Sequence, residues 1–274
     1  WSWDAQSDFD VSSGGPYPED WTHLNDVEVV ELDGREVVMV SLRNQDQVVF
    51  VDFERGLLDE WTLGTDDEHD TLYEQHNPDF VPAERGGPAL LVADSENDRV
   101  VAYAKEDGER VRTWTVGAAS LNWPRDADRL PNGNTLITDT LNHRVMEVTP
   151  RGEVVWEYYA TWGPYDAERP AHGDDSNGPT IRDMNASGTY TITGSANITT
   201  GSRLDTGPAS RLRAVAAETP FEAPADELAT RWAHVAPWIR PVWMSGWDLV
   251  NVLVAVLAGA VWTGSEVFVR WRGS

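Results

Sequence analysis

Three stretches of the chain share one pattern, in which an apolar run, a short polar turn and a second apolar run follow one another. They are residues 37–52 (VVMVSLRNQDQVVFVD), 89–104 (ALLVADSENDRVVAYA) and 134–149 (NTLITDTLNHRVMEVT). Their richness in β-branched residues predicts strands, so each stretch is expected to form a hairpin. The turns are centred on Gln45, Asn97 and Asn142, which lie 52 and then 45 residues apart.

Two further strands are expected around each hairpin. A leading strand contains Asp26, Asp79 or Asp126, and an outer strand ends in tryptophan, as in LLDEWTL, RVRTWTV and EVVWEYY. Four short strands at this period are typical of a β-propeller blade, and the β-branched alternation disfavours helical repeats. We therefore predict an all-β fold, a partial propeller of three to four blades with a C-terminal helical tail. Residues 181–195 are expected in a fourth blade and residues 1–8 in the outer strand of an earlier one.

A change of character after residue 200 sets the predicted domain boundaries. Residues 1–200 should hold the blades, residues 201–241 a linker with helical pieces, and residues 242–271 a transmembrane helix. Between Asp248 and Glu266 lie 17 uncharged residues, the lower limit for crossing a bilayer, with tryptophans on both sides. A buried helix of a soluble protein is the alternative. Glycosylation sequons at Asn185 and Asn197 predict a propeller on the extracellular face of the cell membrane.

Charge narrows the range of partners. The formal net charge is -25, and the acidic residues are scattered along the chain. Such a surface repels nucleic acid, and with Lys105 as the single lysine it suits a halophilic protein from concentrated salt. The absence of cysteine excludes disulfides and thiolate chemistry.

Two of the six histidines occupy matching places. His23 and His76 lie 19 and 18 residues before the aligned turn positions Leu42 and Asp94. Since inner strands of a propeller surround one channel, both side chains should face it, together with Asn25, its counterpart Arg125, and Arg43 at the turn (His23, Asn25, Arg43, His76, Arg125). The arginines oppose a metal and favour an oxyanion, which imidazole could attack. The chain lacks a P-loop and a Gly-rich nucleotide loop, so we expect neither a metal nor a nucleotide cofactor.

The motifs DWTHLNDV, VSLRNQDQVVFVD and YEQHNPDF, in this order, resemble the arylsulfotransferase family, the nucleotide-independent aryl-sulfate sulfotransferases. The segment WPRDADRLPNGNTLITDTLNHRV resembles haloarchaeal, membrane-anchored members, and the match covers roughly residues 18–200. The resemblance implies a six-bladed propeller that moves a sulfuryl group from a phenolic sulfate ester to a phenol through a sulfohistidine. It implies that His76 is sulfated, that His23 and Asn25 hold the sulfuryl oxygens or protonate the leaving phenol, and that Arg43 binds the sulfate. Further blades would have to complete the ring, and without them the residues present here are expected to be inactive.

Structural explanations compete with each of these roles. His76 could stabilise a turn, His23 and Asn25 could cap a strand, Arg43 could pair with Asp46, and Arg125 could bridge to Asp126 or Asp128. At the level of the whole protein, the alternatives are a non-catalytic extracellular propeller that binds a ligand or partner protein in its channel, and a sugar- or cation-binding propeller. The remaining sequence predictions are structural: Asn97, Arg99, Asn142 and Arg144 should hold the hairpin turns, and His69, His143, His172 and His234 should lie at the surface.

Overall fold

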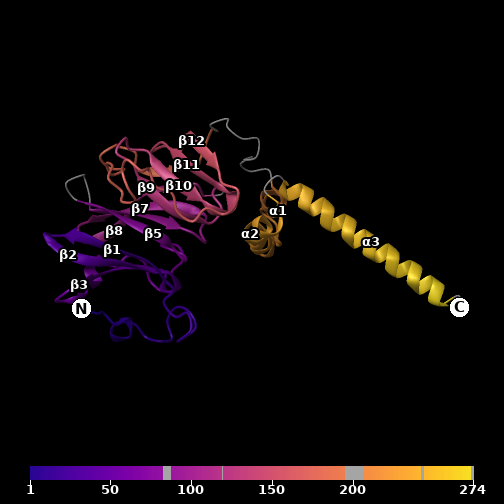
Figure 1. The fold of residues 1–274 in the computed structure, drawn as a ribbon, viewed down its shortest axis with the longest axis horizontal. Helices are drawn as coiled ribbons and strands as arrows, with labels where there is room; N and C mark the ends of the chain where they lie inside the picture. The colour runs from indigo at the N-terminus through magenta and orange to yellow at the C-terminus, as the bar shows by residue number, and fades with distance from the viewer. Residues whose placement is uncertain (83–87, 119, 195–206, 242–243, 273–274) are drawn as a thin grey trace. The chain divides into compact units, whose positions relative to one another are not determined.

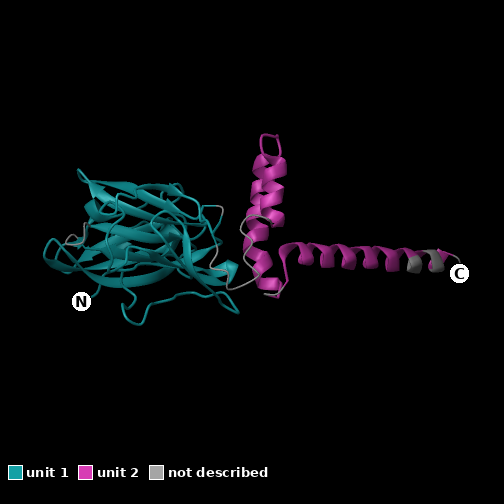
Figure 2. Ribbon diagram, turned by 90° about the horizontal axis from the view of Figure 1, so that it is seen from above, with its two compact units in different colours: residues 1–198 teal, residues 199–274 magenta. Residues whose placement is uncertain are grey.

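The computed structural model describes residues 1–82, 88–118, 120–194, 207–241 and 244–272. The chain divides into two compact units, residues 1–198 and residues 199–274, which Figure 2 colours separately. Each unit is described by itself.

Three β-sheets make up the first unit (Figure 1). Sheet 1 consists of β1 (Leu24–Leu32), β2 (Arg35–Leu42), β3 (Gln47–Asp52) and β4 (Gly56–Leu57). Sheet 2 consists of β5 (His76–Val81), β6 (Ala89–Asp94), β7 (Arg99–Glu106), β8 (Glu109–Val116) and β13 (Gly188–Tyr190). Sheet 3 consists of β9 (Pro124–Arg129), β10 (Thr135–Asp139), β11 (Arg144–Val148) and β12 (Val154–Tyr159). Apart from β13, the strands of each sheet follow chain order and pair antiparallel, so the three predicted hairpins are confirmed.

Two of the predicted blade fragments are wrong. Within residues 181–195, β13 pairs in parallel with β8, Tyr190 opposite Val116, and so extends sheet 2 instead of starting a fourth blade. Residues 1–8 contain a short 3-10 helix, Ala5–Ser7, and no strand. Trp3 and Phe9 pack instead against the buried face of sheet 1 formed by Val40, Leu42, Val49 and Val51. Both segments cover apolar sheet edges or faces, which local periodicity does not reveal.

The outer strand predicted around LLDEWTL is also largely absent. β4 is two residues long, and Trp61 lies in a 3-10 helix, Asp59–Trp61. Trp61 is still buried, and its ring lies 6.1 Å from that of Phe50. The predicted packing of this tryptophan in the core is therefore confirmed, whereas the predicted strand around it is wrong.

The core between sheets 1 and 2 consists of apolar side chains that alternate along β2, β3, β6 and β7. Phe50 meets Phe80 edge to face with ring centroids 5.9 Å apart, and Leu90 and Val92 are completely buried around them. Each such side chain contributes about 1.5–3 kcal/mol on burial. This packing holds the leading strands side by side, β1 against β5 and β5 against β9.

The hairpin turns of sheets 2 and 3 are held by a repeated set of polar contacts. Asn97 and Arg99 both donate to Asp94 Oδ2, at 2.9 and 2.5 Å. In sheet 3, Asn142 and Arg144 donate to Asp139 in the same way, at 2.9 and 2.7 Å. The predicted turn roles are therefore confirmed.

One of the four histidines expected at the surface is not there. His143 follows Asn142 in the turn, has a left-handed φ of 55°, and is only 1% exposed. Asp98 occupies the same left-handed turn position in sheet 2, with φ 53°. Because tertiary packing covers this turn in sheet 3, the polarity of histidine did not indicate its burial.

The second unit contains α1 (Pro208–Ala216), α2 (Glu222–Ile239) and α3 (Gly246–Arg272). Residues Gly246–Ser265 of α3 are long and apolar enough to cross a membrane, with a mean hydropathy of 1.5, and only 6% of the window is buried. A helix so exposed is not a core helix of this unit. Of the two sequons, Asn185 is exposed in a turn, and Asn197 lies outside the described residues.

Candidate functional site

The leading strands of all three sheets carry a register irregularity at the same end. In β1, Leu24 and Asp26 oppose consecutive residues of β2, which leaves Asn25 as the extra residue. In β9 the extra residue is Arg125, and β5 has a similar irregularity between His76 and Asp79. Bulges of this kind redirect side chains. They place the sequence-predicted residues at one end of three neighbouring strands.

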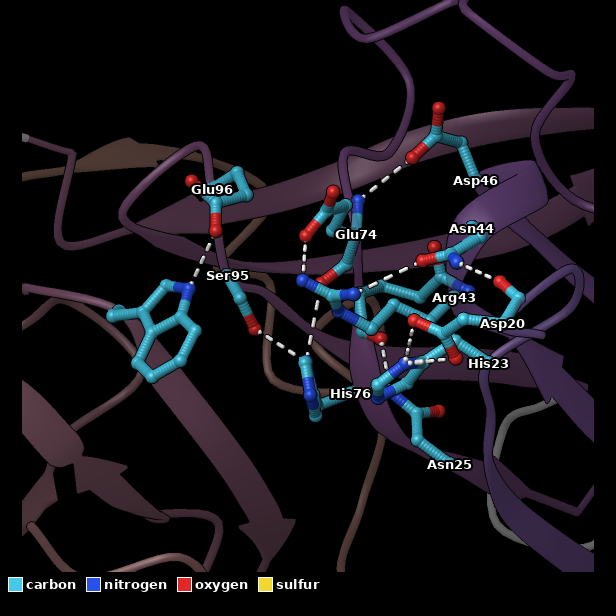
Figure 3. Close-up of polar contacts among 12 residues, drawn as sticks. Asp20, His23, Asn25, Arg43, Asn44, Asp46, Glu74, His76, Ser95 and Glu96 are labelled. Carbon is cyan, nitrogen blue, oxygen red and sulfur yellow. Dashed lines mark hydrogen bonds and ion pairs between the residues drawn. The ribbon is translucent and has the colours of Figure 1, made fainter. Parts of the chain in front are cut away.

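His76 is the buried centre of this end, with no exposed surface. Its Nδ1 lies 2.9 Å from Ser95 Oγ and 3.1 Å from the Glu74 carbonyl oxygen (Figure 3). Its Nε2 lies 2.5 Å from Arg125 Nη1. A carbonyl can only accept a hydrogen bond and a guanidinium can only donate one. Nδ1 therefore carries the proton, and Nε2 presents its lone pair to Arg125.

The surroundings of His76 keep the imidazole neutral. Burial, as the largest cause, and the charges of Arg125, Arg43 and His23 together lower the pKa of His76 to about 2. These three groups act on His76 because they lie around it. A neutral imidazole with a free electron pair at Nε2 is the form that can act as a nucleophile.

A pH titration followed by nuclear magnetic resonance tests this state. Free histidine has a pKa near 6.5, so an ordinary side chain changes its ring signals between pH 8 and about 5. The ring signals of His76 are expected to stay constant over that range, because the lowered pKa keeps the folded protein from binding the proton. A shift of the His76 ring signals with a midpoint near 6.5 would contradict the buried neutral state.

Arg43 lies at the turn after β2 with only 16% of its side chain exposed. Its Nη1 donates to Asn44 Oδ1 at 3.0 Å, and its Nη2 pairs with the Glu74 carboxylate. The pairing of Arg43 with Asp46, considered from sequence, is wrong. Asp46 instead accepts a hydrogen bond from the Glu74 backbone N–H at 2.7 Å. Arg43 thus lies at the His76 site, and its guanidinium is paired with the carboxylate of Glu74.

His23 and Asn25 come from the start of β1 and contribute differently. His23 Nδ1 lies 2.9 Å from Asp20 Oδ1, and this hydrogen bond lowers the pKa of the Asp20 carboxyl. Since Asp20 engages Nδ1, Nε2 is the nitrogen of His23 that remains for a substrate. Asn25 Nδ2 donates to the Gln75 carbonyl oxygen at 2.8 Å and so supports the backbone next to His76.

Arg125 lies between His76 and two aromatic rings. Its guanidinium carbon is 3.6 Å from the Trp123 ring centroid and 5.1 Å from that of Tyr165. Both rings also flank His76, at 6.4 and 6.0 Å between centroids. The contacts of Arg125 therefore run to the candidate site, in place of the bridge to Asp126 or Asp128 considered from sequence. Burial lowers the pKa of Arg125, but an arginine guanidinium stays charged at neutral pH.

A cluster of carboxyl groups continues from the site along the same three strands. Glu28 on β1, Asp79 on β5, and Asp126 and Asp128 on β9 all have a raised pKa, with burial as the largest cause for each and neighbouring carboxylates as a further cause. Among the residues that the structure describes, no three histidine or carboxylate side chains are placed to hold a metal ion.

Among the residues that contact the predicted ones, sequence reasoning missed Asp20, Glu74 and Ser95. Asp20 and Glu74 sit in irregular segments without a repeat to mark them. Ser95 could have been found, because it follows Asp94 as Arg43 follows the aligned Leu42. Applying the repeat alignment to this position would therefore have placed Ser95 at the same point of the next sheet.

No family model and no curated protein matches the chain. Among solved structures, a putative 6-phosphogluconolactonase from Bacteroides uniformis matches with a TM-score of 0.42 and 15% identity over 60% of this chain and 50% of that one. A virginiamycin B lyase from Staphylococcus aureus matches with a TM-score of 0.36 and 10% identity over 53% of this chain and 44% of that one. A streptogramin B lyase gives a TM-score of 0.37 and 12% identity, and covers 52% and 42%. The chain thus spans half or less of each of these structures, and similarity at this level assigns it no activity.

Proposed function

We propose that the protein is an aryl-sulfate sulfotransferase, in which His76 Nε2 takes a sulfuryl group from a phenolic sulfate ester and passes it to a phenol. The observation that carries the proposal is the neutral His76, whose Nε2 lone pair faces Arg125 with Arg43 nearby. A nucleophile surrounded by guanidinium groups suits an anionic, tetrahedral electrophile. The resemblance of the His23, Arg43 and His76 motifs to arylsulfotransferases supports the same reaction.

In the first half-reaction, the Nε2 lone pair forms a bond to sulfur while the bond between sulfur and the aryl oxygen breaks. The bonding pair leaves on the phenolate oxygen, which takes a proton from protonated His23. The sulfated ring keeps its Nδ1 proton and gains positive charge, which the Glu74 carbonyl and Ser95 hydroxyl oxygens stabilise. The positive charges of Arg43 and Arg125 stabilise the negative charge on the sulfuryl oxygens.

In the second half-reaction, the oxygen of an acceptor phenol attacks the sulfur and the nitrogen–sulfur bond breaks. The electron pair returns to Nε2, and the phenolic proton passes to neutral His23, which restores the starting state. Asp20 holds His23 at Nδ1 throughout, so that Nε2 faces the exchanging oxygen.

Both guanidinium groups must exchange partners before this chemistry begins. Arg43 is bonded to Glu74, and Arg125 to the nucleophilic nitrogen itself. A bound sulfate ester offers oxygen acceptors to both, which would release Nε2 from Arg125. Donor binding therefore uncovers the nucleophile in this mechanism.

The proposal also includes the number of blades and the attachment to the membrane. The three sheets are taken as blades of a six-bladed ring, whose remaining blades come from further polypeptide or a second copy. The helix α3 anchors the protein in the cell membrane with the blades on the extracellular face.

The test is single-turnover labelling of the protein with a phenolic sulfate ester that carries radioactive sulfur. The expected result is one acid-labile label per site, located on the peptide that contains His76, and its release when a phenol is added. Phenol release without a labelled protein, or a label on another residue, would rule out the sulfohistidine route.

A second candidate is a ligand-binding propeller without turnover, and the Arg43–Glu74 ion pair favours it because the guanidinium is already neutralised. Calorimetry distinguishes the two functions. Binding of a phenolic sulfate that is recovered intact after long incubation would support the second candidate over the first.

A further inference from the structure

We propose that Ser95 is a positioning residue that holds the His76 imidazole with its nucleophilic nitrogen toward the substrate. The inference deepens the proposed function and rests on it for its catalytic part. Ser95 is completely buried and contacts both His76 and the strand that bears Arg125.

The direction of each hydrogen bond follows from the partners. Ser95 Oγ lies 2.6 Å from the Pro124 carbonyl oxygen, which can only accept, so the single hydroxyl proton goes there. Toward His76, 2.9 Å away, the same oxygen must then accept, and His76 Nδ1 must donate. Ser95 therefore selects the tautomer with its proton on Nδ1, in agreement with the Glu74 carbonyl on the other side.

The same hydroxyl also joins two sheets. Ser95 belongs to the β6–β7 turn of sheet 2, and Pro124 is the first residue of β9 in sheet 3. Arg125 follows Pro124 directly. One side chain thus sets the orientation of the nucleophile and the position of the strand that carries its guanidinium partner.

The repeat supports a specific role for this position. Arg43 and Thr140 occupy the equivalent turn positions in sheets 1 and 3, the first residues of the 3-10 turns that follow β2 and β10. In sheet 1 this position supplies a guanidinium to the site, and in sheet 2 it supplies the Ser95 hydroxyl. Thr140 is buried, but its hydroxyl has no hydrogen-bond partner, which makes it a matched control.

Upon sulfation the bond from Nδ1 to Ser95 becomes charge-assisted, because the ring gains a positive charge while keeping the Nδ1 proton. Such bonds stabilise the charged state more than the neutral one. Ser95 should therefore affect the rate of the chemical step and leave donor affinity nearly unchanged.

The experiment uses the protein with its complete ring of blades and compares it with its Ser95→Ala, Ser95→Thr and Thr140→Val variants. In donor-free protein, the His76 Nδ1–H proton is observed by nitrogen-edited magnetic resonance and its exchange with water is measured. We expect at least about tenfold faster exchange in Ser95→Ala, since one of two acceptors is lost. Ser95→Thr should restore slow exchange, and Thr140→Val should behave as the unmodified protein.

Kinetics provide the second arm. With a phenolic sulfate donor, kcat of Ser95→Ala is expected to fall about tenfold, KM to stay within about twofold, and Ser95→Thr to recover most of the rate. Unchanged Nδ1–H exchange in Ser95→Ala would overturn the positioning role, whatever the activity. Faster exchange in a protein that transfers no sulfate would leave the positioning role intact and refute the proposed function.

Discussion

His76→Ala is expected to lower sulfuryl transfer by at least about 10³-fold, because the proposed covalent step takes place on the Nε2 of His76. The imidazole is fully buried, neutral and held by the oxygens of Ser95 and Glu74 on one side and by Arg125 on the other. Alanine removes the electron pair that attacks sulfur. The measurement is release of phenol and transfer of labelled sulfate to an acceptor by the protein with its complete ring of blades.

His69→Ala is the matched control for this variant. His69 lies in the segment before β5, whereas His76 is the first residue of that strand, and His69 stacks on Tyr73 at 3.8 Å between ring centroids and lies near Asp46. It is expected to keep transfer within about twofold. If His76→Ala transferred sulfate as fast as the unmodified protein, both the sulfohistidine and the role assigned to His76 would be refuted.

Asp128→Asn is expected to make the free energy of unfolding less dependent on pH, by about 1.4 kcal/mol per pH unit between pH 6.5 and 8.5. Asp128 is 2% exposed, and neither carboxyl oxygen has a hydrogen-bond partner. Burial raises its pKa well above the ordinary value, and Asp126 and Asp79 raise it further. The folded protein therefore holds a proton that the unfolded chain has already released.

The sign follows from that difference in bound protons. A raised pKa in the folded state means that stability is greatest at low pH and is lost as the pH rises. Across two units the loss attributable to Asp128 is about 3 kcal/mol. Asparagine holds no titrating proton, so this part of the loss disappears. His76 is present in both proteins, and its unfolded form goes from half neutral at about pH 6.5 to almost fully neutral at about pH 8.5, so its contribution cancels from the comparison.

Denaturant unfolding followed by tryptophan fluorescence, at high salt to screen surface charge, measures this slope. Asp107→Asn is the control, because Asp107 is exposed in a turn where its φ of 49° suits asparagine equally well. An equal pH slope in Asp128→Asn and the unmodified protein would show that Asp128 titrates normally.

The repeats explain why part of the site was predictable. Each hairpin is recognisable in the sequence by two apolar runs around a polar turn. His23 and His76 precede the aligned positions Leu42 and Asp94 by nearly equal intervals. Repeated units that pack in the same way bring equivalent positions to the same end of their strands. His23, Arg43, His76 and Arg125 could therefore be grouped before any contact was known.

Other parts depended on contacts between distant segments. The parallel pairing of β13 with β8, and the packing of Trp3 and Phe9 on sheet 1, give no local periodic signal. The burial of His143 and the ion pair between Arg43 and Glu74 likewise arise from neighbours far along the chain.

From the sequence alone came the three hairpins, the polar clamps at two of their turns, the apolar C-terminal helix and the group of residues that carries the candidate chemistry. These follow from local periodicity and repetition, which act over a few neighbouring residues. Only the tertiary structure decided which nitrogen of His76 bears the proton, which partners Arg43 and Arg125 hold, and how deeply the carboxyl cluster lies. Protonation and pairing depend on burial and on charges a few ångströms away, and those are set when separate sheets pack together.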